Sequence, residues 1–192
     1  MNTQTLPMWK RELPMWLTWS RVAICPFIVI CILNDSQLAG WIAAILFMLG
    51  GVTDWLDGSL ARRWNVQSNM GRFMDPIADK VLVSSALIML IPKGKVGAIM
   101  VLLLLVRDII IGGIRSVAAA DNLVIDAKAA GKWKTALQMG AIPVLLVDFS
   151  FLDSRIETAA QAVLWFSVIL SLISGAQYIW LYYEAKRSSF RK

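Results

Sequence analysis

Six apolar stretches separated by short polar breaks dominate this chain of 192 residues and restrict its fold more than any other feature. A helix that crosses a bilayer needs about 20 mainly apolar residues, with a range of about 17–25. Each break carries Gly, Pro, Asn, Asp or charged residues, as turns do. We therefore predict an all-α integral membrane protein, one domain over residues 1–192, with six transmembrane helices at about 16–33, 38–61, 75–91, 96–119, 133–148 and 157–183.

The positive charges predict the orientation. With six spans, both termini share one side with the polar connectors at 62–74 and 121–132, and most of the Lys and Arg residues fall there. The opposite side holds only Lys93, Lys95 and Arg155. The positive-inside rule makes the side with the termini cytoplasmic, which predicts an enzyme of the cytoplasmic (inner) membrane. The net charge of +6 is spread over the ends of the apolar stretches and leaves no basic face, so we predict no nucleic-acid partner.

The first 15 residues are too polar and too rich in tryptophan for a cleaved signal peptide, and no small-residue cleavage site precedes the first span. Three tryptophans and two cations indicate a segment that lies in the membrane interface: Trp9, Trp16 and Trp19, with Lys10 and Arg11. We predict an N-terminal interfacial segment over residues 1–15 that leads into the first span.

The chain has no histidine, which excludes imidazole bases, histidine metal ligands and phosphohistidine intermediates. Its two cysteines, Cys25 and Cys31, are six residues apart in one apolar stretch and so point about 240° apart around a helix. We predict two buried thiols that do not pair.

Four aspartates interrupt the apolar pattern within DWLDGSLARRWNVQSNMGRFMDPIAD, residues 54–79. Asp54 and Asp57 end the second stretch, and Asp75 and Asp79 begin the third; on helices, each spacing places both carboxylates on one face. Consecutive antiparallel helices bring the two pairs together, where unpaired carboxylates cost several kcal/mol each. A divalent metal removes that cost, and all-oxygen ligands favour Mg²⁺ or Mn²⁺.

Small and basic residues accompany the aspartates. Gly58 and Ala61 form a strip without bulky side chains, and Arg62 follows them. Metal, a flat surface and an arginine together suit a nucleotide linked through a diphosphate. Two alternatives stay open: aspartates solvated at the membrane edge and balanced by arginines, and small residues that only pack helix against helix.

The whole stretch carries a family resemblance. Written with its spacing, Asp54-x2-Asp57-Gly58-x2-Ala61-Arg62-x8-Gly71-x3-Asp75-x3-Asp79 resembles, position for position, the signature of the CDP-alcohol phosphotransferases. These are membrane enzymes that move a phosphatidyl or related group from a CDP-linked donor to an alcohol. The element Pro14-Met15-Trp16-Leu17-Thr18-Trp19-Ser20-Arg21 resembles the family's N-terminal P-x-x-L-T-x-x-R, with Met15 where a polar residue is common.

The resemblance implies roles for these residues. Asp54, Asp57 and Asp75 would hold two Mg²⁺ or Mn²⁺ ions, while Asp79 would share one ion and serve as general base. The CDP-diacylglycerol site would be formed by Thr18, Gly58, Ala61, Arg62, Ser68 and Gly71. A homodimer is implied by the family alone.

The acceptor is predicted from cations farther along the chain. Arg107, Asp108 and Arg115 interrupt the fourth stretch, and Lys132 and Lys134 open the fifth. An ion pair between Asp108 and Arg115, seven residues apart, and lysines that only flank the membrane are the structural alternatives. Together, however, the two arginines and two lysines exceed what anchoring requires and favour an acceptor that carries its own phosphate.

The pattern R-D-x6-R, followed by G-K-x-K-T-x-x-Q at residues 131–138, is similar to that of family members whose acceptor is sn-glycerol 3-phosphate. It implies that Arg107, Arg115, Lys132 and Lys134 bind the acceptor phosphate. The expected products are phosphatidylglycerophosphate and CMP. Two alternatives stay open: another acceptor (inositol phosphate, serine or phosphatidylglycerol) and a transporter coupled to cations or protons.

Overall fold

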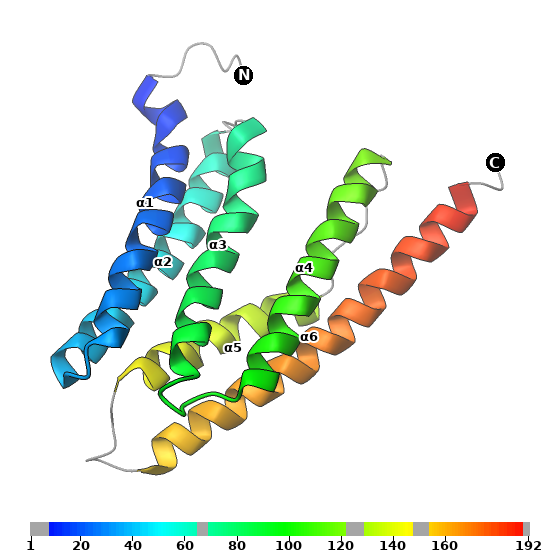
Figure 1. Ribbon diagram of the computed structural model, residues 1–192. Coiled ribbons are helices and arrows are strands. Elements are labelled where there is room, and N and C mark those ends of the chain that lie inside the picture. The colour runs from blue at the N-terminus through cyan, green and yellow to red at the C-terminus, as the bar shows by residue number, and fades with distance from the viewer. Residues whose placement is uncertain (1–7, 65–68, 122–128, 148–153, 190–192) are drawn as a thin grey trace.

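All regular structure in the part of the chain that the structure describes is helical. The computed structural model describes residues 8–64, 69–121, 129–147 and 154–189. Its helices are α1 (Met8–Leu33), α2 (Gln37–Trp64), α3 (Asn69–Leu90), α4 (Ala98–Ala120), α5 (Ala129–Leu146) and α6 (Ser154–Ser189) (Figure 1). Each overlaps one predicted apolar stretch, so the predicted all-helical fold is confirmed.

Several helices extend beyond the apolar stretches. The predicted bounds of the connector, 62–74, were wrong, because α2 continues to Trp64 and α3 begins at Asn69. The first helix begins at Met8, so residues 8–15 of the predicted interfacial segment are helical, and α5 and α6 begin inside predicted breaks. Polar residues such as Arg and Gln end an apolar pattern without ending a helix, since their helix propensities are high. Arg62 and Gly71 therefore lie on helices.

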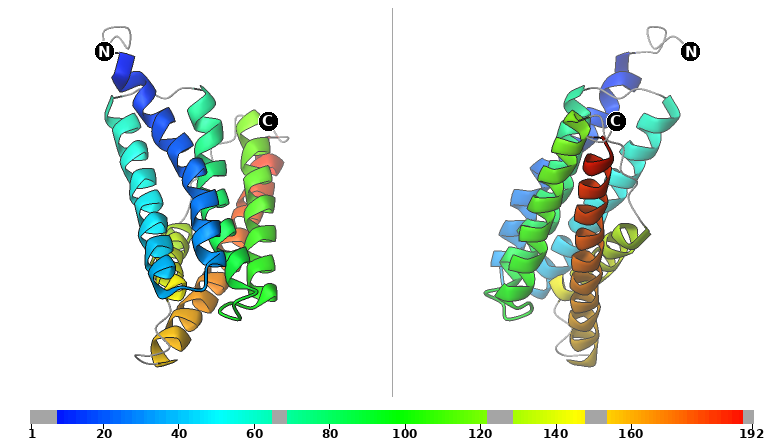
Figure 2. Two further views of the ribbon diagram at one scale, coloured as in Figure 1. Left: turned by 60° about the vertical axis from the view of Figure 1, so that its left-hand side comes forward. Right: turned by 90° about the vertical axis from the view of Figure 1, so that its right-hand side faces the viewer.

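The six helices form two groups joined by a crossing helix. Helix α1 packs against both α2 and α3, and α4 packs against α6. Helix α5 packs against α6 and α2 and thereby connects the groups (Figures 1 and 2). The α2–α3 junction lies at the same end of the bundle as the beginning of α1 and the end of α6 (Figure 1).

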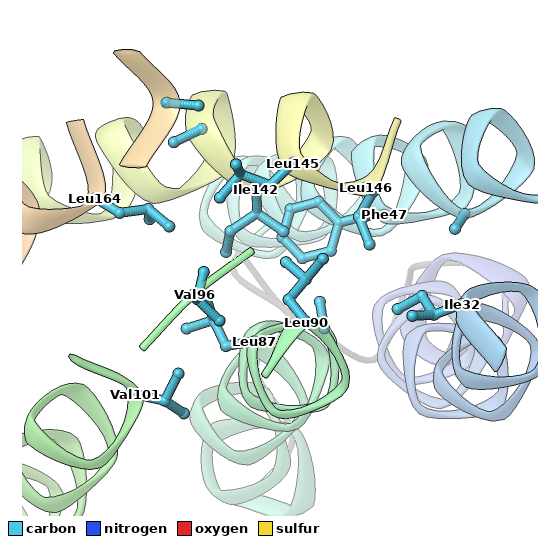
Figure 3. Packing of buried hydrophobic residues seen from close by; sticks show 14 of the residues in the cluster. Ile32, Phe47, Leu87, Leu90, Val96, Val101, Ile142, Leu145, Leu146 and Leu164 are labelled. Atoms are coloured by element: carbon cyan, nitrogen blue, oxygen red, sulfur yellow. The ribbon is translucent and has the colours of Figure 1, made fainter. Parts of the chain in front are cut away.

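The apolar core lies toward the other end. It is built from the last turns of α1, α3 and α5 and the first turns of α2, α4 and α6, with Ile28, Phe47, Leu90, Ile142 and Leu164 almost fully buried (Figure 3). The apolar core is therefore remote from the end of α2 and the beginning of α3.

The approach of α2 to α5 at the core depends on one glycine. A Cβ atom at Gly40 would lie 2.7 Å from the carbonyl oxygen of Leu146, so a side chain there would separate the two helices. Small residues that allow such close backbone approach are common where membrane helices pack.

The two cysteines remain free, as predicted. Cys25 is buried and its thiol donates to the carbonyl oxygen of Arg21 at 3.3 Å. Cys31 is only partly buried, so the prediction of two buried thiols is confirmed for Cys25 alone.

Many large apolar side chains are exposed on the described surface, while several polar side chains are buried. At least two thirds of the residue surface is exposed at Trp16, Leu38, Ile99, Ile109 and Trp180. Less than a tenth is exposed at Arg21, Lys134, Gln138, Ser167 and Ser171. Monomeric soluble proteins rarely expose large contiguous apolar surfaces, so this distribution favours a lipid environment.

Among the described residues, one helix of 33 residues, Arg155–Arg187, has both the length and the apolar composition to cross a membrane. Shorter apolar segments occupy Thr18–Leu33, Gln37–Thr53 and Lys80–Leu90. Six membrane spans therefore stay a prediction.

Candidate active site

The four motif aspartates lie on two consecutive helices, α2 and α3, at the same end of the bundle (Figure 1). Asp54 and Asp57 are on the last turns of α2, and Asp75 and Asp79 are on the first turns of α3 (Figure 1). Their side chains lie outside what the structure describes, so the predicted metal geometry stays a prediction. Within the described residues no other group of three His, Cys, Asp or Glu side chains could hold a metal ion.

Four of the six predicted donor-site residues lie on the same two helices. Helices α2 and α3 carry Gly58, Ala61, Arg62 and Gly71, whose surroundings lie outside the described part, as does Ser68 altogether. Thr18 on α1 is described and is 1% exposed. A buried hydroxyl at this position is consistent with the predicted site but does not by itself test it.

A buried arginine connects the N-terminal element to the helix that carries the first aspartates. Arg21 is completely buried, and its Nε donates to the carbonyl oxygen of Gly50 at 3.2 Å. The Thr53 hydroxyl donates to the same oxygen at 2.8 Å. Gly50 lies one turn before Asp54 on α2. Arg21 therefore fixes α1 against α2 next to the start of the aspartate motif, a role that the sequence pattern did not assign.

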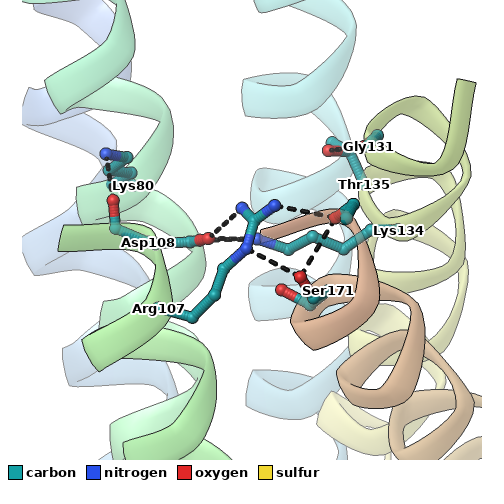
Figure 4. Close-up of polar contacts among 8 residues, drawn as sticks. Lys80, Arg107, Asp108, Gly131, Lys134, Thr135 and Ser171 are labelled. Atoms are coloured by element: carbon teal, nitrogen blue, oxygen red, sulfur yellow. Dashed lines mark hydrogen bonds and ion pairs between the residues drawn. The ribbon is translucent and has the colours of Figure 1, made fainter. Parts of the chain in front are cut away.

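A cluster of charges joins α4 to α5. The Lys134 ammonium donates to both carboxylate oxygens of Asp108, at 2.5 and 2.6 Å, and Arg107 Nη1 donates to Oδ1 at 2.9 Å (Figure 4). Lys134 is 5% exposed, so this pair is shielded from solvent. The burial of a lysine requires such a partner, because an unpaired ammonium costs several kcal/mol away from water.

The alternative pairing of Asp108 with Arg115 was wrong. The Arg115 guanidinium instead lies 5.3 Å from the centre of the Tyr178 ring on α6, a cation–π distance. Two helical turns separate Asp108 from Arg115, about 10 Å along the axis, whereas Lys134 reaches the carboxylate directly from the neighbouring helix.

Arg107 also holds α4 against α6. Its Nε donates to the carbonyl oxygen of Ser171 at 2.9 Å, and its Nη2 donates to the Ser174 hydroxyl at 2.8 Å (Figure 4). A Cβ at Gly175 would lie 3.2 Å from Arg107 Nε, so the glycine provides room for the guanidinium. Arg107 therefore uses its guanidinium to join α4 to α6 as well as to pair with Asp108.

Lys80 is a further cation beside this cluster that the sequence analysis did not single out. It directly follows Asp79, and its ammonium donates to the carbonyl oxygen of Asp108 at 2.8 Å (Figure 4). A Cβ at Gly112 would approach the ammonium to 2.5 Å, so α4 is shaped to receive it. The sequence alone could have indicated Lys80, because a cation inside an apolar helix marks a functional position by default.

The structure thus brings Arg107 and Lys134 together around Asp108, with Lys80 beside them. Arg115 lies farther along α4, and the side chain of Lys132 on α5 lies outside the described part. All of these positions fall inside the region that a family comparison matches: the model for the CDP-alcohol phosphatidyltransferases matches residues 11–173.

The chain belongs to the CDP-alcohol phosphatidyltransferase family.

Curated members of this family from distant bacteria resemble the chain over most of its length. One from Rickettsia bellii is 35% identical over 168 residues, which cover 87% of this chain and 93% of the relative. One from Haemophilus influenzae is 36% identical, covering 88% and 92%, and one from Bacillus subtilis is 34% identical, covering 93% and 98%. All three are named CDP-diacylglycerol–glycerol-3-phosphate 3-phosphatidyltransferase.

Proposed function

We propose that this protein transfers the phosphatidyl group of CDP-diacylglycerol to sn-glycerol 3-phosphate, giving phosphatidylglycerophosphate and CMP. The named activity of three relatives that are similar over most of the chain supports this reaction. The observation in the structure that carries the proposal is the buried cation cluster between α3, α4 and α5.

The charge of that cluster matches a phosphorylated acceptor. Lys80, Arg107 and Lys134 contribute three positive charges and Asp108 one negative charge, which leaves two positive charges. A phosphate monoester carries about −1.5 to −2 at neutral pH, so it would neutralise the excess. An acceptor without a phosphate, such as serine, would leave these cations uncompensated.

The donor would bind at the α2–α3 junction. The donor set of Asp54, Asp57, Asp75 and Asp79 contains only oxygen atoms, and the two helices place both pairs at one end of the bundle, which suits two Mg²⁺ or Mn²⁺ ions. Such ions would offset the charge of the diphosphate and of the departing CMP. Gly58, Ala61, Arg62, Ser68, Gly71 and Thr18 are proposed to hold the CDP group.

The proposed transfer needs one proton acceptor. Asp79 takes the proton from the 1-hydroxyl of glycerol 3-phosphate as that oxygen attacks the β-phosphorus of CDP-diacylglycerol. The bond from the β-phosphorus to the bridging oxygen breaks, and the electron pair leaves with CMP. Lys80, the next residue, places a cation on the same helix and beside Asp108. Lys134, Arg107, Arg115 and Lys132 are proposed to orient the acceptor through its phosphate.

We further propose that the protein is an integral enzyme of the cytoplasmic membrane, with its termini and active site facing the cytoplasm, and that it acts as a homodimer. The exposed apolar side chains and the long apolar helix Arg155–Arg187 support a lipid environment. The acyl chains of the donor would then stay in the bilayer while its head group enters the cytoplasmic end.

A panel of acceptors tests the proposed function. Purified protein in mixed micelles with CDP-diacylglycerol and Mg²⁺ is expected to release CMP with sn-glycerol 3-phosphate, and far more slowly with inositol phosphate, serine or phosphatidylglycerol. CMP release and the lipid product are measured together. A faster reaction with any other acceptor would reject the proposed substrate, and no reaction with any of them would reject the enzyme class.

The acceptor-phosphate assignment predicts a selective defect. Lys134→Ala removes a charge-assisted hydrogen bond worth about 1.5–3 kcal/mol, so the KM for glycerol 3-phosphate should rise by roughly 10- to 150-fold. The KM for CDP-diacylglycerol should change little. Lys93→Ala is the matched control, because Lys93 pairs with Asp35 at the opposite end of the bundle and should leave both values unchanged. A rise in the donor KM instead would assign Lys134 to the diphosphate.

A further inference from the structure

A cavity of about 230 Å³ lies between α3, α4 and α5, next to the cation cluster. Most of its wall is aliphatic, and its polar lining consists of Lys80, Ser84, Asp108, Lys134, Thr135 and Gln138. One water molecule needs about 10–15 Å³ of such volume, so the cavity has room for a three-carbon polyol. Its two cations, Lys80 and Lys134, belong to the cluster whose net positive charge is proposed to attract the acceptor phosphate.

Gln138 is the unexplained group in this cavity. It lies one helical turn after Lys134 on α5 and is 3% exposed, yet its side-chain nitrogen has no hydrogen-bond partner within the described structure. Buried donors are nearly always paired, so an unpaired one in a cavity wall indicates a ligand contact.

The other neutral polar side chains of the cavity already donate within their own helices. The Ser84 hydroxyl donates to the carbonyl oxygen of Lys80 at 2.6 Å. The Thr135 hydroxyl donates to the carbonyl oxygen of Gly131 at 3.3 Å (Figure 4). Of these three neutral side chains, Gln138 therefore retains an N–H donor for a ligand.

We propose that Gln138 determines specificity for the acceptor by donating a hydrogen bond from its amide nitrogen to the 2-hydroxyl of sn-glycerol 3-phosphate. This inference rests on the proposed function. In glycerol 3-phosphate one hydroxyl reacts and one carbon carries the phosphate, which leaves the 2-hydroxyl as the group that distinguishes it from a simple diol phosphate. Lys134 would hold the phosphate one turn away from Gln138, so one face of α5 would contact both the phosphate and the central hydroxyl of the acceptor.

With this contact, the protein would select its acceptor by whether the buried Gln138 amide finds a hydrogen-bond partner. An acceptor without the 2-hydroxyl would leave the buried amide unpaired in the complex, and a site built to bind a hydroxyl rejects the analogue that lacks it. The reaction itself does not need that hydroxyl, because proton transfer involves only the 1-hydroxyl. Gln138 is thus expected to affect the choice of acceptor rather than the chemical step.

The test compares two acceptors that differ by this one group: sn-glycerol 3-phosphate and 3-hydroxypropyl phosphate. The wild-type protein is expected to prefer glycerol 3-phosphate by about 10-fold in kcat/KM, the effect of one hydrogen bond. Gln138→Leu should lose about 10-fold with glycerol 3-phosphate and keep its value with 3-hydroxypropyl phosphate, so the preference disappears.

Gln161→Leu is the matched control. This glutamine lies on α6, and its amide nitrogen donates to the carbonyl oxygen of Lys95 at 3.0 Å, outside the cavity. The same substitution there should leave the ratio of the two kcat/KM values unchanged. If Gln138→Leu does not fold, as judged by its thermal unfolding in detergent, Gln138→Met provides an unbranched replacement of similar length with the same expectation.

The outcomes separate this inference from the proposed function. A wild-type protein that uses neither acceptor overturns both. A wild-type protein that uses glycerol 3-phosphate, with equal losses on the two acceptors in the Gln138 variants, overturns only this inference and makes Gln138 a packing residue. Loss of the preference in the Gln138 variants alone supports it.

Discussion

Removal of divalent cations with a chelator is expected to abolish transfer from CDP-diacylglycerol completely, and added Mg²⁺ or Mn²⁺ should restore it. The reason is the proposed donor set: four aspartates lie on the last turns of α2 and the first turns of α3, and the chain has no histidine to complete a softer site. Activity is measured as CMP release before chelation, after it and after each metal is added back.

The chelated protein should remain folded, because the apolar core lies toward the opposite end of the bundle and does not involve the aspartates. Its helical circular dichroism is the control. Full turnover in metal-free buffer would contradict the metal site, and recovery with Zn²⁺ but with neither Mg²⁺ nor Mn²⁺ would contradict its oxygen-only ligands.

Replacement of Asp79 by asparagine is expected to lower kcat by about 10²–10⁴, the usual effect of removing a general base. Asparagine keeps the size of the side chain but cannot accept the proton of the acceptor hydroxyl at neutral pH. Because Asp54, Asp57 and Asp75 remain, the variant should still bind CDP-diacylglycerol in the presence of Mg²⁺. Single-turnover rates at saturating acceptor measure the defect.

Asp57→Asn is the matched comparison, because it makes the same chemical change at a position proposed to bind metal only. It should weaken metal and donor binding as well as turnover. Donor affinity is measured separately by titration of CDP-diacylglycerol without acceptor at fixed Mg²⁺. Asp79→Asn must bind the donor more tightly than Asp57→Asn does; equal losses would make Asp79 only a fourth metal ligand.

The helices were predictable because each coincides with an apolar stretch, and their ends were not. The prediction placed a connector at 62–74, yet the backbone is helical up to Trp64 and again from Asn69. Apolar pattern reports which residues contact lipid or core, whereas helix formation depends on backbone hydrogen bonds and propensity. A polar helix end that leaves the apolar layer therefore looks like a loop in the sequence.

Some parts of the candidate site could be predicted from the sequence, and others depend on tertiary contacts. The aspartates form a local pattern within 26 residues, so their helical faces could be predicted from spacing. The pairing of Asp108 with Lys134 could not, since Lys134 is 26 positions away and comes from another helix. Spacing along one helix offered Arg115 as an alternative partner, but Lys134 reaches the carboxylate from α5. Arg21 and Ser174 likewise gain their partners from tertiary contacts.

The environment of Gln138 could not be predicted from the sequence pattern. The sequence places it in a recognisable run with Lys132 and Lys134, but only the structure shows that its amide is buried in a cavity wall without a partner. The residue type shows which hydrogen-bonding groups a side chain has, and the structure shows which of those groups are buried without a partner.

The central claim is that one phosphatidyl group moves to glycerol 3-phosphate for each CMP released. The most direct measurement follows CMP and lipid product together in micelles containing CDP-diacylglycerol, Mg²⁺ and labelled sn-glycerol 3-phosphate, for the wild-type protein and for Asp79→Asn. The expected result is equal amounts of CMP and labelled phosphatidylglycerophosphate from the wild type, with both slowed together in the variant. CMP released without label in the lipid, or label in the lipid at the same rate in both proteins, would contradict it.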